Sequence, residues 1–184
     1  MRRWSPPWFS GNPWAMRLSF ASAPLLASAL TLAACAAPLP PRAPVAADRA
    51  AITAVIDDFH DAAAQADEAR YFGHFAEDGV FLGTDATERW DVPAFRAYAH
   101  PHFEKKKAWS FRAIRRAVTV DASGAVAWFD EDLATPNLGP ARGSGVLVKH
   151  GAEWKISQYN LAITVPNERF DAVKKAAAGE ACGK

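Results

Sequence analysis

The second half of the chain consists almost entirely of sequence that favours β-strands. Four segments are rich in β-branched and aromatic residues, and short stretches with turn-forming residues (DASG, TPNLGPARG and HGAE) separate them. The HG of the last stretch is typical of a tight hairpin. The four segments are Trp109–Val120, Ala125–Thr135, Gly143–Lys149 and Glu153–Thr164. We therefore expect a run of long antiparallel strands.

Helical patterns precede these strands. Apolar residues recur at helical spacing from Ile52 to Phe59, which predicts an amphipathic helix from Asp48 to about Ala66. A second, short helix is expected to follow from Asp67, its N-cap, to Phe75. A third should begin at Val92, behind Asp91 as N-cap, and end near Lys107.

The remaining segments complete a fold class. We expect a short strand over residues 79–82, then a polar turn (GTDATERW), and a terminal helix over residues 167–178. Helices followed by a run of strands are an α+β order. A strongly curved sheet wrapped around the helices would leave an open cone, and such concavities are the usual sites of ligands.

Composition excludes several classes of function. Lys plus Arg number 21 and Asp plus Glu number 20, so the net charge of +1 gives no reason to expect a nucleic acid partner. The two cysteines, Cys35 and Cys182, lie near opposite ends of the chain, so a disulfide between them would not stabilise the core. There is no CxxC and no His/Cys cluster at zinc spacing. We expect neither a metal nor a cofactor.

The N-terminal region predicts export and anchoring. From Met16, which we expect to be the true start, a single Arg precedes an apolar Ala/Leu-rich run that ends in small residues, as in a secretory signal. Leu-Ala-Ala-Cys at residues 32–35 resembles the bacterial lipobox, in which Cys35 becomes the lipidated N-terminus. The alternative is ordinary cleavage at an A-x-A site, which would leave a secreted protein without an anchor.

These features divide the chain into four parts. We expect a signal peptide over residues 1–34, the lipidated cysteine with a Pro/Ala-rich tether over 35–49, a folded domain over 50–178 and a disordered tail over 179–184. The protein would then be anchored by its lipid to a membrane of the bacterial cell envelope, facing the periplasm and most simply on the outer membrane.

Three motifs carry a resemblance to a known family. FAEDGVFLGTDATERW, AWFDEDL and RGSGVLVKHGAEWKISQYNLAITVPNE, in this order, resemble the SnoaL-like branch of the nuclear transport factor two-like superfamily, over about residues 50–168. The resemblance implies a cone-shaped α+β fold with a pocket inside the cone, often dimeric through the sheet. The superfamily includes steroid isomerases, polyketide cyclases, dehydratases and members without assigned activity, so the fold alone does not give the function.

The sequence departs from the enzymes of this superfamily at two places. Ketosteroid isomerases carry their general base on the first strand, and the matching position here is Gly83, so that base is missing. Polyketide cyclases use a His/Asp arrangement that none of the five histidines matches. The candidates for an acid or base are therefore Asp85 and Glu88, near Trp90. Alternatively, Asp85 caps a turn and Glu88 pairs with Arg89 on the surface. His60 could project into the cone or be a buried structural histidine.

Ligand-binding candidates come from the strands. Regular alternation on the last strand places Gln158 and Asn160 on the face of Trp154 and Ile156, so we expect both amides to point into the cone. There they either bind a polar ligand or water, or belong to an internal hydrogen-bond network. Trp128 is a further candidate, although alternation does not say whether its face or that of Phe129, Glu131 and Leu133 points inward.

Two functions remain open. The first is a binding or accessory module that holds a small apolar or amphipathic molecule in the cone. The second is a small cofactor-free isomerase, cyclase or dehydratase that transfers a proton in the same pocket. We also expect a homodimer through the outer face of the sheet, where alternation places Tyr159, Leu161 and Ile163.

Overall fold

The computed structural model describes residues 45–179 of the 184, all of which belong to the unit Leu39–Lys184. The predicted signal peptide, residues 35–44 of the predicted tether with Cys35, and Cys182 lie outside the described residues. Residues 45–49, also assigned to the tether, belong instead to the first helix. The helices are α1 (Val45–Ala64), α2 (Glu68–Gly73), α3 (Val92–Glu104) and α4 (Phe170–Ala177), with a 3₁₀ turn η1 (Asn167–Arg169) before α4. The strands are β1 (Phe75–Leu82), β2 (Arg89–Asp91), β3 (Arg112–Val120), β4 (Val126–Thr135), β5 (Gly139–His150) and β6 (Glu153–Ile163).

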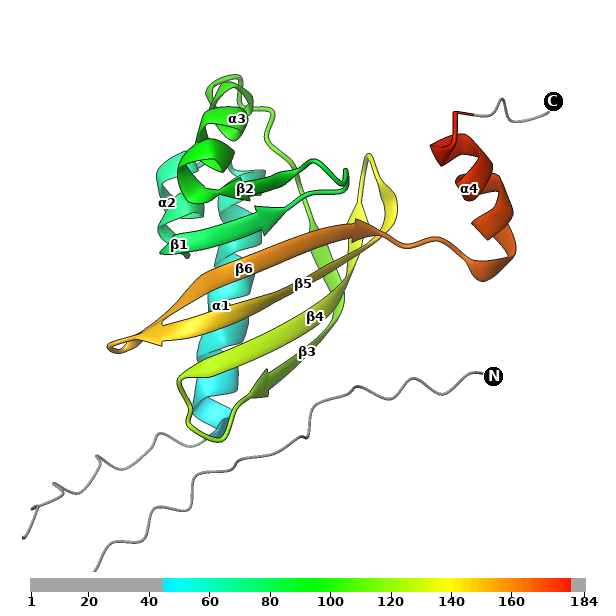
Figure 1. Ribbon diagram of the computed structural model, residues 1–184. Coiled ribbons are helices and arrows are strands. Elements are labelled where there is room, and N and C mark those ends of the chain that lie inside the picture. The colour runs from blue at the N-terminus through cyan, green and yellow to red at the C-terminus, as the bar shows by residue number, and fades with distance from the viewer. Residues whose placement is uncertain (1–44, 180–184) are drawn as a thin grey trace, which may run out of the picture. The chain divides into compact units, whose positions relative to one another are not determined.

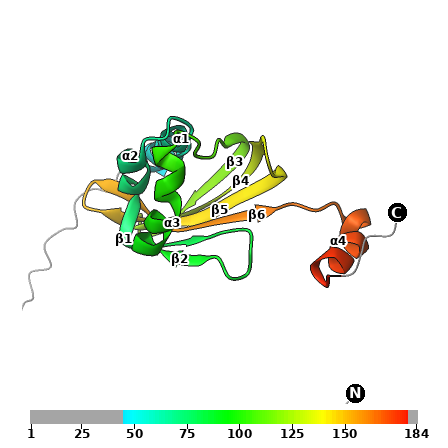
Figure 2. The ribbon, with the colours of Figure 1, turned by 90° about the horizontal axis from the view of Figure 1, so that it is seen from above.

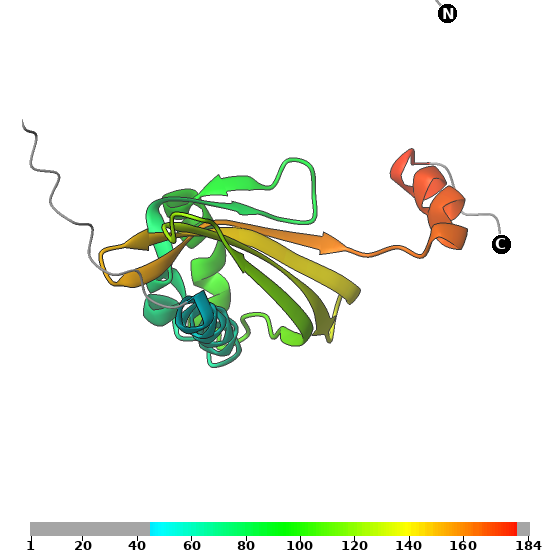
Figure 3. The same cartoon turned by 90° about the horizontal axis from the view of Figure 1, so that it is seen from below.

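The strands form one curved sheet in the order β2-β1-β6-β5-β4-β3 (Figure 1). Every neighbouring pair is antiparallel except β1 and β6, which are parallel. Helix α1 crosses the concave face and is seen end-on in Figure 3, where the strands curve around it. Its buried residues, among them Ile52, Ile56 and Phe59, face the sheet. The predicted α+β cone is confirmed.

The starts of α2 and α3 are also as predicted, whereas α1 begins at Val45, before the predicted Asp48, and α4 begins at Phe170, after the predicted residue 167. Asp67 caps α2, because its side chain accepts a hydrogen bond from the backbone N of Arg70 at 3.1 Å. Asp91 caps α3 in the same way, accepting from Ala94 N at 2.8 Å. Gly151, in the β5–β6 turn, has φ +62°, which a glycine adopts without a steric penalty.

The region between the second and third helices contains more sheet than we expected. Strand β1 begins at Phe75 rather than Gly79, and it shifts its register with β6 between Phe75 and Val80. The segment expected to be a turn ends in β2, which pairs antiparallel with the end of β1. Three-residue strands carry too little periodicity to be recognised from sequence.

Strand β6 contains a β-bulge, which makes one prediction wrong. Val146 pairs with Gln158 and the next residue of β5, Leu147, pairs with Ile156, so Ser157 has no partner of its own. The extra residue reverses the alternation after Ile156. Gln158 and Asn160 therefore face outward rather than into the cone.

Because of the same bulge, the residues that we expected on the outer face of β6 do not lie there. Tyr159 is 0% exposed and Leu161 7% exposed, because both belong to the core, whereas Ile163 is 49% exposed. All three residues on which we based the dimer therefore lie on the concave side, since Ile163 pairs with Ala141, which in turn pairs with the buried Leu133.

Strand β4 alternates without interruption, and its faces can now be assigned. Phe129, Glu131 and Leu133 are buried on the concave face. Trp128 lies on the outer face and is 49% exposed, so it does not reach the inside of the cone.

Helix α4 stands apart from the sheet in both Figure 1 and Figure 2, beyond a short connection after β6. It has no buried residue, and Phe170 and Val173 are exposed. Among residues 45–179, none of the helices has the length and apolar character needed to cross a bilayer.

Candidate functional site

A cavity of about 320 Å³ opens at the end of the cone where β1 and β2 are joined. Its walls come from this loop, from α3, from the segment before β3, from the β4–β5 loop and from Leu161 of β6. Six of the lining side chains are aromatic: Phe81, Trp90, Phe95, Tyr98, Trp109 and Phe111. Polar groups at the cavity come from Thr84, Glu88, Ser110, Thr135 and Asn137. A volume of this size suits a small organic molecule.

Several of the aromatic rings lie nearly parallel. Trp90 stacks on Tyr98 with centroids 4.7 Å apart and on Phe95 at 5.7 Å, with interplanar angles of 21° and 10°. Phe95 in turn stacks on Trp109 at 5.9 Å and 20°. Parallel planes of this kind present a wall along which another flat ring can stack in the offset geometry that aromatic pairs prefer.

Glu88 is the carboxylate of this cavity. Its Oε2 accepts a hydrogen bond from Asp85 N at 3.1 Å, and it lies over Gly83, where a Cβ atom would collide with it. The backbone of the two residues is joined as well, since Gly83 N donates to Glu88 O at 2.8 Å. The absence of a side chain at Gly83 is therefore what gives the Glu88 carboxylate its place.

Asp85, the other acidic candidate of this loop, does not line the cavity. Its Oδ1 accepts from Thr87 N at 2.8 Å and from Thr87 Oγ1 at 2.6 Å. The hydroxyl and the backbone N–H of Thr87 hold the pKa of the Asp85 carboxyl below its usual value. Asp85 thus acts as the capping residue of the turn.

The four ligand-binding candidates divide between the two faces of the sheet. Trp90 lines the cavity. Trp128 and Gln158 lie on the outer face, in one row across the sheet through Val146, with which both pair. Asn160 follows in the next outward row. The sequence interpretation missed five aromatic residues of the cavity, because nothing in their local pattern distinguishes a ring that lines a cavity from one in the core: Phe81, Phe95, Tyr98, Trp109 and Phe111.

A network of hydrogen-bonded polar side chains is buried behind the cavity. His60 Nε2 lies 2.6 Å from Oε1 of Glu131, and Tyr159 OH donates to the same oxygen at 3.2 Å. The other oxygen accepts from Arg116 Nε at 2.8 Å. Arg116 also pairs with Asp57 of α1 at 2.7 Å, so this network joins α1 to three strands.

The charge state of this network is set by competing effects. Burial of Glu131, which is 0% exposed, would raise its pKa, but the hydrogen bond with His60 and the charge of Arg116 outweigh burial and lower the pKa below its ordinary value. Burial and the neighbouring Glu131 raise the pKa of Tyr159 well above its ordinary value. The carboxylate is therefore ionised and fully engaged by its neighbours.

None of the residues of this network lines the cavity. Phe111 separates the two, since it lines the cavity and its ring lies 6.1 Å from that of His60. His60 therefore has the geometry of the structural alternative. Its carboxylate partner was not identifiable from sequence, because alternation along β4 allowed either face to point inward.

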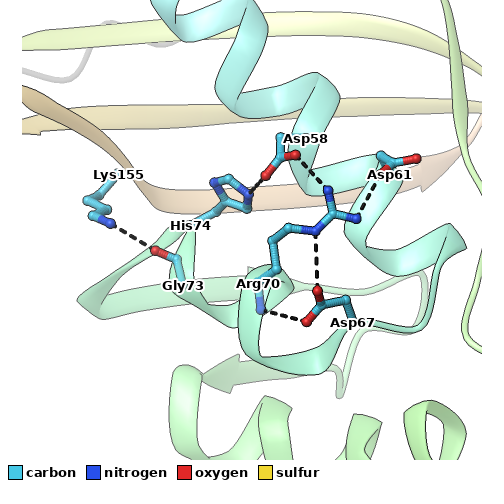
Figure 4. Close-up of polar contacts among 7 residues, drawn as sticks. All are labelled: Asp58, Asp61, Asp67, Arg70, Gly73, His74 and Lys155. Carbon is cyan, nitrogen blue, oxygen red and sulfur yellow. Dashed lines mark hydrogen bonds and ion pairs between the residues drawn. The ribbon is translucent and has the colours of Figure 1, made fainter.

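A third polar cluster joins α1 to α2 and to the residues that follow α2 (Figure 4). Arg70 of α2 pairs with Asp58 and with Asp61 of α1, both at 2.7 Å. His74 Nε2 lies 2.8 Å from Asp58, and burial lowers the pKa of His74 although the carboxylate acts in the opposite direction. Lys155 Nζ donates to Gly73 O at 2.9 Å. These contacts tie α2 to α1 and β6, and are structural.

Among residues 45–179, no three His, Cys, Asp or Glu side chains come together in a way that could hold a metal ion.

Comparisons with known proteins identify the family. The model of the SnoaL-like domain matches residues 52–166, which is more than half of the chain. No curated protein matches the sequence.

Solved structures share the fold at low sequence identity. A protein from Novosphingobium aromaticivorans, provisionally assigned as an aromatic ring hydroxylase, superposes with a TM-score of 0.56 and 19% identity over 68% of this chain and 94% of its own. Another from the same organism, provisionally assigned as a scytalone dehydratase, gives 0.54 and 13% over 65% and 86%. An NTF2-like protein of unknown function from Pseudomonas putida KT2440 gives 0.53 and 16% over 68% and 92%. The chain belongs to the SnoaL-like domain family, with the nuclear transport factor two-like fold.

Proposed function

We propose that this protein binds a small, flat, apolar or amphipathic molecule in the cavity at the open end of the cone. The observation that carries this proposal is the wall of parallel rings around a cavity of about 320 Å³. The buried groups of His60, Arg116 and Glu131 are paired with one another, and none of the three lines the cavity. The geometry thus favours holding a ligand over transforming it.

A fluorescent naphthalene probe tests this function. N-phenyl-1-naphthylamine, which is flat and apolar, should bind with increased emission, and Tyr98→Ala should weaken binding roughly threefold to tenfold because one stacking ring is lost. Trp128→Ala is the matched control, since Tyr98 and Trp128 are both 49% exposed but only Tyr98 lines the cavity. Equal affinities for the wild type and both variants would refute binding in this cavity.

A second candidate function is proton transfer, in which Glu88 acts as general base. It is favoured by one observation, the position of the Glu88 carboxylate over Gly83, where the resemblance to ketosteroid isomerases would place a base. A carboxylate from the following loop would then take the place of the missing side chain.

Deuterium exchange measures this activity without knowledge of the substrate. If Glu88 is a base, the protein should accelerate exchange of the acidic α-protons of 2-tetralone, a flat ketone, in D₂O. Glu88→Gln should then reduce the acceleration roughly a hundredfold or more, and Asp85→Asn should not. No acceleration by the wild-type protein would leave binding as the function of the cavity.

We further propose that the domain is held at a membrane of the cell envelope, facing the periplasm, by lipidation of Cys35. The lipobox-like sequence and the Pro/Ala-rich tether support this, and several acyl chains on one cysteine suffice for stable anchoring. Cys35→Ala should move the protein from the membrane fraction to the soluble fraction. A mature N-terminus that is an unmodified residue other than Cys35 would contradict the proposal.

The homodimer is also a proposal, now on different residues. Trp128 is 49% exposed on the outer face, in one row with the partly buried Val146 and the exposed Gln158. Pairing of two such faces around a two-fold axis would cover them. Light scattering should therefore give a dimer mass for the wild type and a monomer mass for Trp128→Glu, and a wild-type monomer at tens of micromolar would end this proposal.

A further inference from the structure

The charge on the cavity wall has only one sign. Of the described residues that line the cavity, Glu88 is the only one with a charged side chain at neutral pH, and no Lys, Arg or His is among them. On the basis of the binding function proposed above, we propose that the cavity prefers ligands that carry a positively charged amine on a flat apolar body.

Glu88 has acceptor capacity beyond its contact within the loop. One of its oxygens accepts from the backbone N of Asp85 at 3.1 Å. An ionised carboxylate has about four lone-pair sites on two oxygens, so an ammonium group in the cavity can donate to it. Such charge-assisted hydrogen bonds are shorter and stronger than neutral ones.

The aromatic wall adds to the same preference. The faces of aromatic rings carry a partial negative charge and attract cations, with tryptophan as the strongest of the three aromatic side chains. Trp90 is two residues from Glu88, and both line the cavity together with Tyr98 and Trp109. A cation beside Glu88 is therefore also close to electron-rich rings, whereas an anion would meet repulsion from both.

Basic residues next to the cavity wall in the sequence do not line it. Arg89 follows Glu88 and Arg112 follows Phe111, and both are exposed and outside the cavity. Lys105, Lys106 and Lys107 precede Trp109, but all three are exposed and none lines the cavity. Salt and water screen charges of this kind. His102 is exposed and does not line the cavity either, although its ring lies 5.7 Å from that of Tyr98.

Three probes with one skeleton and different charges test the preference. 1-Naphthylmethylamine is a cation at pH 7, 1-ethylnaphthalene is neutral and 1-naphthoate is an anion. We expect each to displace N-phenyl-1-naphthylamine from the full-length protein, with the amine binding about threefold to tenfold more tightly than the neutral compound and the anion most weakly.

Two variants assign the preference to Glu88. Glu88→Gln keeps the shape of the side chain and should make the amine and the neutral probe bind equally. Asp85→Asn removes a negative charge from the same loop, but from a carboxylate that is held by Thr87 and does not line the cavity, so it should keep the preference.

The failure of this inference is distinguishable from failure of the binding function. Displacement by all three probes with equal affinity would overturn the cation preference and leave the binding function intact. A preference for the amine that survives in Glu88→Gln would overturn the role of Glu88. If none of the probes binds to the wild-type protein, both the proposed function and this inference are wrong.

Discussion

At the scale of single residues, Glu131 is the side chain on which most of the buried polar contacts converge. It is 0% exposed and accepts hydrogen bonds or ion pairs from His60, Arg116 and Tyr159. Glu131→Gln should lower the free energy of unfolding at pH 7 by about 3–5 kcal/mol, because Arg116 would lose a buried charge partner. Urea denaturation checks this, with the outward neighbour Asp130→Asn as a control that should change stability by less than about 0.5 kcal/mol.

The same carboxylate predicts how stability depends on pH. Its pKa in the folded protein lies below the ordinary value of 4.5, so the folded state favours the ionised form. The contribution of Glu131 is complete above about pH 4.5, the unfolded value, and declines as the pH falls through the lower folded pKa. The difference in stability between wild type and Glu131→Gln should therefore shrink below pH 4.5, and a difference that is constant from pH 7 to pH 3.5 would contradict this.

Single residues were predictable where the signal is local. The N-caps Asp67 and Asp91 were identified because capping depends on residues three positions away. His60 was also noticed, but its partner is 71 positions away on β4. Pairing at that distance depends on which face of the strand is buried, and the sequence of β4 carries a carboxylate on both faces.

At the scale of elements, β5 is shaped by glycines that make room for its neighbours. A Cβ atom at Gly143 would collide with Tyr159 Oη and lie 2.7 Å from Glu131 Oε1. Gly143→Ala should therefore push these groups apart and destabilise the fold by about 1–3 kcal/mol. Gly73→Ala, where nothing lies within 4 Å, is the control and should be neutral or stabilise α2 by up to about 1 kcal/mol. Equal effects of the two substitutions in urea denaturation would refute this account.

The elements also show where the sequence is insufficient. Helices α1, α2 and α3 and the four long strands follow from periodicity and turn residues. The bulge at Ser157 does not, because it appears only when β6 is paired with β5. Because of this one unpaired residue, Gln158 and Asn160 face outward, and Tyr159 and Leu161 face into the cone. The amides that we expected to bind a ligand therefore lie outside it.

At the scale of the whole molecule, α4 contributes little to the stability of the domain. It has no buried residue and stands apart from the sheet. Ending the chain after Pro166 should change the free energy of unfolding by less than about 0.5 kcal/mol. A loss of more than 1 kcal/mol in urea denaturation would mean that α4 packs on the domain in solution. Binding of N-phenyl-1-naphthylamine should also be unchanged, because no residue of α4 lines the cavity.

The parallel pairing of β1 with β6 sets the order in which this molecule can fold. Residues 75–82 pair with residues 156–160, so a central junction of the sheet joins segments about 80 positions apart. Phe81 and Leu161, which both line the cavity, come from these two strands. A nascent chain can form α1 and α2 early, but the sheet and the cavity cannot close until the final strand has left the ribosome. Contacts of such sequence separation are slow to form, so we expect the completed chain to fold in roughly milliseconds to seconds, with the pairing of β1 and β6 among the last steps.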